Sequence, residues 1–213
     1  MSPATVRIAS VADIEQRAAA ADALAAAFQM DPSWSMVVRD PGTRRSVLTT
    51  ALSALTADSP RRHTLLVALV DGNVVGAAIA WMPGYHPSPF RTPQYVLAAA
   101  TIVRDAGVAT VPLWRRWRAM RTADPTGEPH WHLAVLGVRP DAQHRGIGRA
   151  LLEAFLKRVE DAGGAAYLET SRPELVAWYA AAGFGVRERL TLPGGATTWT
   201  MWRAPTSAYT GPA

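Results

Sequence analysis

The chain has 213 residues, of which 49% are hydrophobic, and this is enough to bury the core of one compact domain. It contains no cysteine, which excludes disulfides, cysteine-ligated metal sites and thiol catalysis. The net charge of +5 comes from scattered arginines with one cluster at 115–121, so an anionic small ligand accounts for it as well as a nucleic acid does.

Targeting and membrane signals are not evident in the sequence. The first ten residues, MSPATVRIAS, lack the basic and apolar regions of a secretory signal. No run of about 18 uncharged apolar residues occurs, so no membrane-spanning helix is expected. We therefore expect a cytoplasmic protein that binds neither a membrane nor a nucleic acid.

Hydrophobic periodicity and turn residues predict strands and helices in the first half of the chain. The expected elements are a strand, two helices and a hairpin, at 5–9, 13–29, 42–57 and 63–81. Asp31-Pro32 separates the two helices. Residues 82–129 are less regular, because prolines between 83 and 93 indicate a loop, and two helical patches follow around 94–105 and 111–122.

The second half alternates more regularly. The expected elements are a strand, an amphipathic helix, a strand, a helix and a closing hairpin, at 130–138, 148–162, 165–169, 171–183 and 185–203. No internal repeat or linker separates these elements from the first half. We therefore predict a single mixed α/β (α+β) domain over residues 1–213, with an ordered core at about 5–203 and a loose tail at 204–213.

The most informative stretch joins the strand at 130–138 to the helix that follows it, and reads Gln143-His144-Arg145-Gly146-Ile147-Gly148. Glycines let the backbone approach a ligand, and the first N–H groups of a helix have no partner inside the helix. With the positive end of the helix dipole they form a site for a phosphate or pyrophosphate, next to Arg145 and Arg149. Leu151 stands where a dinucleotide-binding fold has a third glycine, so that fold is disfavoured.

This stretch resembles the Q/R-x-x-G-x-G/A signature of the GCN5-related N-acetyltransferase (GNAT) superfamily. A second stretch, Leu168-Glu169-Thr170 followed by Trp178-Tyr179-Ala180-Ala181-Ala182-Gly183-Phe184, is similar to the family's F-Y-x-x-x-G-F segment. Residues 128–203 are most similar to puromycin N-acetyltransferase-like enzymes. The resemblance implies the GNAT fold, a central mixed, mostly antiparallel sheet of about seven strands with helices on both faces, and it implies acetyl-CoA as acyl donor.

The resemblance also implies a coenzyme-binding set. In the family, the pantetheine arm lies along the signature strand, where a bulge separates it from its neighbour. Carried over, the backbone of Leu136 and Val138 would contact the pantetheine. The turn would hold the pyrophosphate through Gln143, His144, Arg145, Gly146, Gly148 and Arg149. His144 stands where the family usually has a glycine.

Two residues are the candidates for proton transfer. Tyr179 matches the tyrosine that the family often uses to protonate the departing CoA thiolate, although a core tyrosine with a satisfied hydroxyl is the alternative. His132 is the expected base, because the attacking amine must lose a proton and imidazole titrates near neutrality. A histidine bonded across the sheet is the alternative, with His130 and Glu128 as reserve bases.

A metal site is not expected. His130 and His132 share one face of their strand and are residue types that bind metals. No carboxylate or third histidine is evident near them in the sequence, and the resemblance implies no metal.

For the acceptor, the sequence indicates only an environment. Aromatic residues at element ends or in loops, together with one carboxylate, suit a cationic amine on an apolar body, although each aromatic also fits the core. The candidate residues are Phe28, Asp31, Trp34, Trp81, Tyr85 and Trp131. The basic amphipathic segment Trp114–Arg121 is interpreted as a solvated face that packs through its tryptophans. The alternatives are a dimer contact and a contribution to binding the phosphates of coenzyme A.

The resulting hypothesis is an acetyl-CoA-dependent N-acetyltransferase. It transfers an acetyl group to the primary amine of a small molecule, antibiotic-like or metabolic, by direct attack in a ternary complex. The alternatives are acetylation of a protein or peptide amine and a non-catalytic acyl-CoA sensor. The chain is expected to be a monomer or a homodimer.

Overall fold

Seven strands form one mixed sheet in the order β1-β2-β3-β4-β5-β7-β6. The structure is a computed structural model that describes residues 6–11, 13–58, 62–88, 92–125, 127–192 and 195–206. Neighbouring strands are antiparallel except β4 and β5, which are parallel. The predicted fold class is therefore confirmed. The expectations for residue 5 and for residues 207–213 of the tail lie outside the described residues.

The elements agree closely with the predicted ones. The strands are β1 (Arg7–Ser10), β2 (His63–Val70), β3 (Asn73–Trp81), β4 (His130–Val138), β5 (Ala165–Thr170), β6 (Gly185–Thr191) and β7 (Thr197–Arg203). The helices are α1 (Ile14–Phe28), α2 (Pro32–Ser35), α3 (Pro41–Thr56), α4 (Pro93–Ala106), α5 (Thr110–Ala123), α6 (Ile147–Asp161) and α7 (Pro173–Ala180). The short α2 was not predicted, although Asp31 caps it and Pro32 occupies its first turn.

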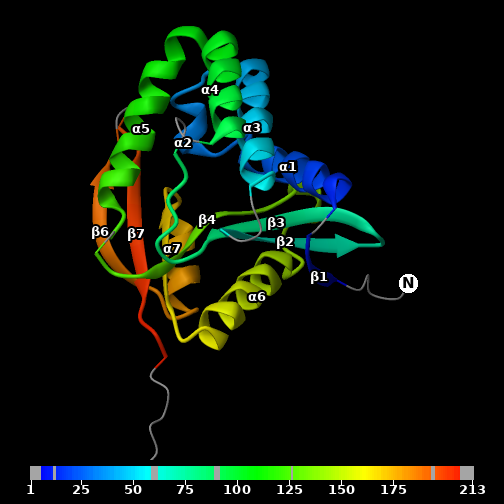
Figure 1. Cartoon of the computed structure of the whole chain (residues 1–213), viewed down its shortest axis with the longest axis vertical. Helices are drawn as coiled ribbons and strands as arrows, with labels where there is room; N and C mark the ends of the chain where they lie inside the picture. Colours follow the sequence, from blue (N-terminus) through cyan, green and yellow to red (C-terminus); the bar gives the residue numbers. More distant parts are fainter. Residues whose placement is uncertain are drawn as a thin grey trace, which may run out of the picture.

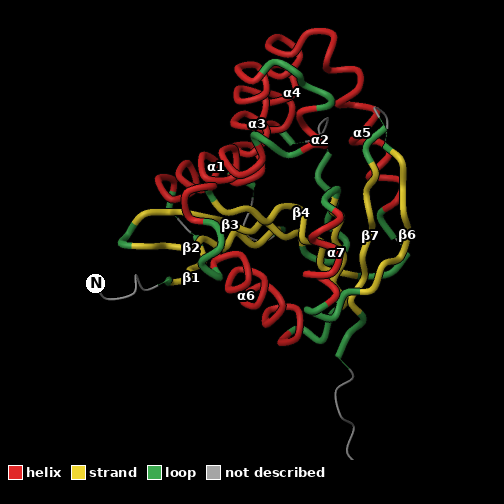
Figure 2. The backbone as a smooth tube through the Cα atoms, turned by 180° about the vertical axis from the view of Figure 1, so that it is seen from behind, coloured by secondary structure: helices red, strands yellow, loops and turns green. Residues whose placement is uncertain are grey.

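Helices cover both faces of the sheet, with α1 and α3 on one side and α6 on the other (Figures 1 and 2). The alternation of β2 produces this arrangement. Leu65, Val67 and Leu69 pack with α1 and α3, whereas Leu66 and Ala68 pack with α6. Side chains that face α6 thus alternate with side chains that face α1, so both sides of these central strands are buried.

The connection between α1 and α3 contains Asp31 and Trp34, two of the residues predicted to bind the acceptor. The buried side chain of Arg44 holds this connection in place. The guanidinium of Arg44 donates hydrogen bonds to the carbonyl oxygens of Gln29 (2.8 Å), Val38 (2.7 Å) and Arg39 (3.1 Å). Because these carbonyls lie on either side of α2, Arg44 fixes the segment that contains Asp31 and Trp34.

The segment 93–123 is the one part of the described chain that is long and apolar enough to cross a membrane by length and composition. Gly107, at φ 51°, ends α4, and the chain turns back into α5 (Figure 1). Each helix has 14 residues and is roughly 21 Å long, shorter than the hydrocarbon core of a bilayer, which is about 30 Å. The segment is therefore a helical hairpin, in which α4 packs against α3.

Candidate active site

The parallel strands β4 and β5 separate part of the way along the sheet. They pair only from His130 with Ala165 to Leu133 with Leu168. On its other edge, β4 carries a bulge at Ala134, because Ala80 pairs with Leu133 and Ile79 with Val135. Beyond Leu133, β4 and β5 diverge, and a cavity of about 740 Å³ lies along the exposed edge of β4.

One end of this cavity is the turn between β4 and α6. Gly146, at φ 76°, is the N-cap of α6 and has no side-chain cap bond. The first hydrogen bond of the helix runs from Ala150 N to Gly146 O (3.0 Å), which leaves the N–H groups of residues 147–149 without a helical partner. The Gln143 side chain donates to the carbonyl of Val138 (3.0 Å) and so ties the turn to the strand.

Most of the predicted coenzyme-binding residues lie on the wall of the cavity. They are Leu136, Val138, Gln143, His144, Gly146, Gly148 and Arg149. Arg145 is exposed and does not line the cavity. His144 has φ 62°, a left-handed conformation that glycine adopts at no steric cost, and this explains why the family usually has a glycine there.

Tyr179 lines the cavity and is buried. Burial raises the pKa of its hydroxyl well above the usual value, so the group stays protonated. Among the residues that the structure describes, none forms a hydrogen bond with this hydroxyl, and the rings of Trp178 and Phe184 pack edge-on against the Tyr179 ring. The phenol is thus fixed in position, with its proton available to a ligand.

The other end of the cavity is aromatic and lies under α2, α4 and α5. Four predicted acceptor residues line it, namely Phe28, Asp31, Trp34 and Trp81, together with Tyr95, Trp117 and Met120. Asp31 also caps α2 by accepting a hydrogen bond from Ser33 N (2.9 Å).

Two predicted acceptor residues do not line the cavity. The Tyr85 hydroxyl donates to Asp58 Oδ2 (2.5 Å), which also accepts from Tyr95 (2.8 Å), so Asp58 joins the loop that contains Tyr85 to α4. Trp131 packs in the core cluster on the α6 face of the sheet. It lies there because strand alternation turns residues 131 and 133 toward α6 and residues 130 and 132 away from it.

Glu169 lines the cavity, although it was not predicted as a site residue. His132, the predicted base, does not line it. His132 is buried behind Glu169, with Nε2 at 2.8 Å from Glu169 Oε2. The second oxygen, Oε1, is buried and has no hydrogen-bond partner among the described residues. A signal was available, because alternation along β5 puts Glu169 on the face opposite to Leu168, which packs with α6.

The charged side chains at the aromatic end of the cavity are Arg116, Asp31 and Glu169. Arg116 lines the cavity and lies over the ring of Trp34, 5.8 Å from its centroid. Burial lowers the pKa of Arg116, and the charges of Asp31 and Glu169 oppose this effect. Burial would also lower the pKa of His132, but Glu169 and Asp124 outweigh it and raise the pKa to about 9.

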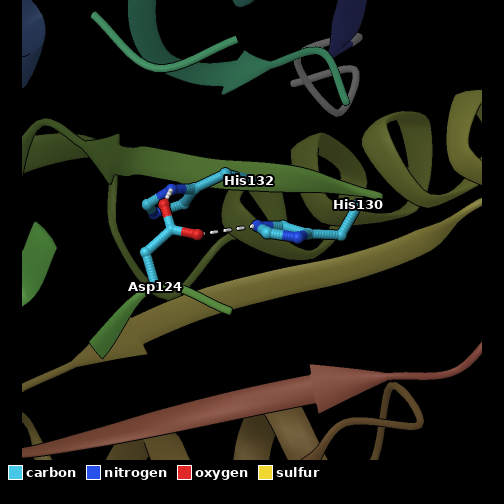
Figure 3. A group of neighbouring side chains, drawn as sticks. All are labelled: Asp124, His130 and His132. Carbon is cyan, nitrogen blue, oxygen red and sulfur yellow. Dashed lines mark ion pairs between the residues drawn. The ribbon is translucent and has the colours of Figure 1, made fainter. Parts of the chain in front are cut away.

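Next to this end of the cavity, Asp124 lies between His130 and His132 (Figure 3). Asp124 Oδ1 is 3.4 Å from His130 Nε2, and Oδ2 is 3.5 Å from His132 Nδ1. A third histidine, His86, approaches the same carboxylate, with Nδ1 at 3.2 Å from Oδ2. These neighbours could not be predicted from residue spacing, because Asp124 and His86 come from separate loops.

A family model described as "Acetyltransferase (GNAT) family" matches residues 32–184, and the chain belongs to this family of acyltransferases. Its recognition from the two sequence motifs is therefore confirmed.

Known proteins are similar to the chain at the level of the fold. A structure of a histone acetyltransferase HPA2 and related acetyltransferase from Corynebacterium glutamicum is 18% identical with a TM-score of 0.68, covering 97% of this chain and 99% of that one. PaiA N-acetyltransferase from Thermoplasma acidophilum, solved with coenzyme A, is 14% identical with a TM-score of 0.57, covering 94% of this chain and 99% of that one. A polyamine N-acetyltransferase from Drosophila melanogaster is 16% identical with a TM-score of 0.60, covering 93% and 98%.

A curated relative is similar to part of the sequence. A mycothiol acetyltransferase from Propionibacterium freudenreichii subsp. shermanii is 39% identical over 69 residues. The match spans 31% of this chain and 22% of that relative.

Proposed function

We propose that the chain transfers the acetyl group of acetyl-CoA to the primary amine of a small molecule with an apolar body. The observation that carries this proposal is the single cavity, which joins the turn at the start of α6 to an aromatic chamber with Glu169 and Tyr179 on its wall. The reactants would meet there and react directly, without a covalent enzyme intermediate.

The residues of the turn fit a coenzyme A diphosphate. The three N–H groups of residues 147–149 have no helical partner and lie at the positive end of the α6 dipole. The unpaired edge of β4 offers backbone groups to a pantetheine arm along Leu136 and Val138. When bound, acetyl-CoA supplies an acetyl group activated as a thioester.

The chain's own residues then handle two protons. Glu169 accepts a hydrogen bond from the amine and receives its proton as the amine attacks, with His132 Nε2 holding the carboxylate in place. Tyr179 donates its phenolic proton to the departing thiolate. The geometry thus supports Glu169 as the proton acceptor in contact with the substrate, and His132 as the residue that orients it.

The shape of the chamber favours a small acceptor over a protein. Side chains of α2, α4 and α5 line the acceptor end, and a peptide would instead need an open groove. Asp31 and Glu169 suit an amine, and Trp34, Trp81 and Trp117 suit an apolar or aromatic body. We propose an antibiotic-like or metabolic amine, acetylated in the cytoplasm by a monomer or a homodimer.

A thiol-release assay tests the proposal. The protein is mixed with acetyl-CoA and a panel of small amines that includes puromycin, alongside peptides with free amines, and free thiol is followed with a chromogenic disulfide. The protein has no cysteine and contributes no background. Thiol release with small amines is expected. Release with peptides alone would contradict the small-molecule proposal, and a rise in melting temperature with acetyl-CoA but no release would indicate a sensor.

A further inference from the structure

Three of the five histidines gather around one buried aspartate beside the acceptor chamber. Figure 3 shows this aspartate, Asp124, with two of them, His130 and His132. His86 lies in the loop after β3, Asp124 directly follows α5, and His130 and His132 lie on β4. The side chains of Asp124, His130 and His132 are 2%, 3% and 9% exposed, and that of His86 is 23% exposed. The chemistry described above uses only the outer nitrogen of His132, so the cluster itself has no assigned role.

The hydrogen bonds of two of these histidines fix which ring nitrogen faces the aspartate. His130 Nδ1 is 2.6 Å from the carbonyl oxygen of Glu128, which can only accept, so Nδ1 carries the proton. His132 Nε2 likewise donates to Glu169 Oε2 at 2.8 Å. His130 Nε2 and His132 Nδ1 are therefore the nitrogens that face the Asp124 carboxylate, and a cation placed between them would be held by all three side chains.

Buried polar atoms that lack hydrogen-bond partners also lie in this cluster. His86 Nδ1, Asp124 Oδ1 and His132 Nδ1 are buried and have no hydrogen-bond partner among the described residues. Buried polar atoms without partners are rare in folded proteins, and each requires a physical explanation. Here the three atoms belong to residue types that ligate metals.

The distances fit coordination better than hydrogen bonding. The carboxylate oxygens lie 3.2–3.5 Å from the three imidazole nitrogens, longer than a charge-assisted hydrogen bond of about 2.7–2.9 Å. With metal–ligand bonds of about 2.0–2.1 Å in a tetrahedron, neighbouring ligand atoms lie about 3.3 Å apart. The ligand atoms of Asp124, His130 and His132 all lie within 4.8 Å of one another. His86 is outside this group and, of its three members, contacts only Asp124, so its side chain would move toward the other two histidines to supply a fourth ligand.

We propose that His86, Asp124, His130 and His132 form a zinc site. Three imidazoles and one carboxylate are the ligand set that zinc favours, whereas magnesium and calcium favour oxygen-rich sites. Glu128 and Glu169 complete the outer shell by fixing the far ring nitrogens of His130 and His132. The aromatic rings of Trp81, Tyr167 and Trp202 surround the two imidazoles and limit access of water.

The ion would act on structure, since with four protein ligands it keeps no open position for a substrate. It would fasten the loop after β3 and the end of α5 to β4, and so stabilise one wall of the acceptor chamber. This proposal differs from the expectation from the sequence, in which only His130 and His132 were close together and no metal site was expected.

Zinc binding to the full chain tests the proposal. Protein stripped with a chelator is titrated with Zn²⁺ and, separately, with Mg²⁺ in a calorimeter. One equivalent of Zn²⁺ is expected to bind, and at zinc 100-fold above Kd the melting temperature is expected to rise by roughly 5–10 °C. Mg²⁺ is expected to change neither heat nor melting temperature. Absence of stoichiometric zinc binding would overturn the proposal.

Variants locate the ion. His86→Gln, on a partly exposed loop, and His130→Gln are expected to weaken zinc binding at least tenfold, with circular dichroism confirming that each variant folds. His144→Gln, an exposed histidine outside the cluster, is the matched control and is expected to retain one equivalent. Loss of zinc in His144→Gln, or unchanged affinity in His86→Gln and His130→Gln, would show binding elsewhere and contradict the assignment. These readouts do not depend on acetyl transfer.

Discussion

Replacing Tyr179 with phenylalanine is expected to lower turnover by about 10²–10⁴-fold while binding of coenzyme A stays near normal. The substitution removes only the hydroxyl. Burial keeps this hydroxyl protonated, and no described residue forms a hydrogen bond with it. The ring, held by Trp178 and Phe184, remains in place. Turnover is measured by thiol release with the best amine of the panel, and coenzyme binding by calorimetry.

Tyr85→Phe is the matched control, because this tyrosine lies outside the cavity and its hydroxyl bonds to Asp58. Its turnover is expected to remain close to that of the native chain, apart from a modest loss of stability. Equal turnover of Tyr179→Phe and the native protein would remove Tyr179 as the proton donor.

Replacing Glu169 with glutamine has the second of the two largest expected effects. The amide keeps the size of the side chain and can still bond to His132, but it cannot receive a proton from the attacking amine. We expect turnover to fall by about 10²–10⁴-fold, with little change in affinity for coenzyme A, since Glu169 lies on β5 and is not part of the turn at 143–149.

Glu128→Gln serves as the control for the loss of a carboxylate. Glu128 was a reserve base in the sequence interpretation, but its side chain is half exposed and pairs with Arg187 at 2.8 Å. Its turnover is expected to be unchanged. A large loss in Glu128→Gln together with full activity in Glu169→Gln would reverse the assignment of the proton acceptor.

The sequence predicted most of the fold because its signals are local. The apolar stripe Leu151, Leu152, Phe155, Leu156 and Val159 defined α6, and all five side chains are buried. The glycines and Gln143 located the turn, since backbone conformation and helix ends depend on neighbouring residues.

The acceptor end was only partly predictable, because its chemistry depends on contacts between distant segments. Asp124 and His86 meet β4 only in the folded chain, so the residue spacing around His130 did not reveal them. Arg116 was visible only as one member of a basic cluster, although it lines the cavity. The alternation of side chains along β4 decided which predicted residues reach the site. Trp131 faces α6, whereas His132 faces Glu169.

The central claim is that the backbone N–H groups at the start of α6 bind the diphosphate of coenzyme A, and calorimetry of Gly148 variants tests it most directly. A Cβ at Gly148 meets only ordinary contacts, 3.8 and 3.9 Å from Val138 and Leu136, so Gly148→Ala is expected to fold and bind normally. The branched side chain of Gly148→Val would obstruct approach to the amides and is expected to weaken binding by about 100-fold. Absence of heat when the native chain is titrated with coenzyme A, or equal affinity in Gly148→Val, would contradict the account.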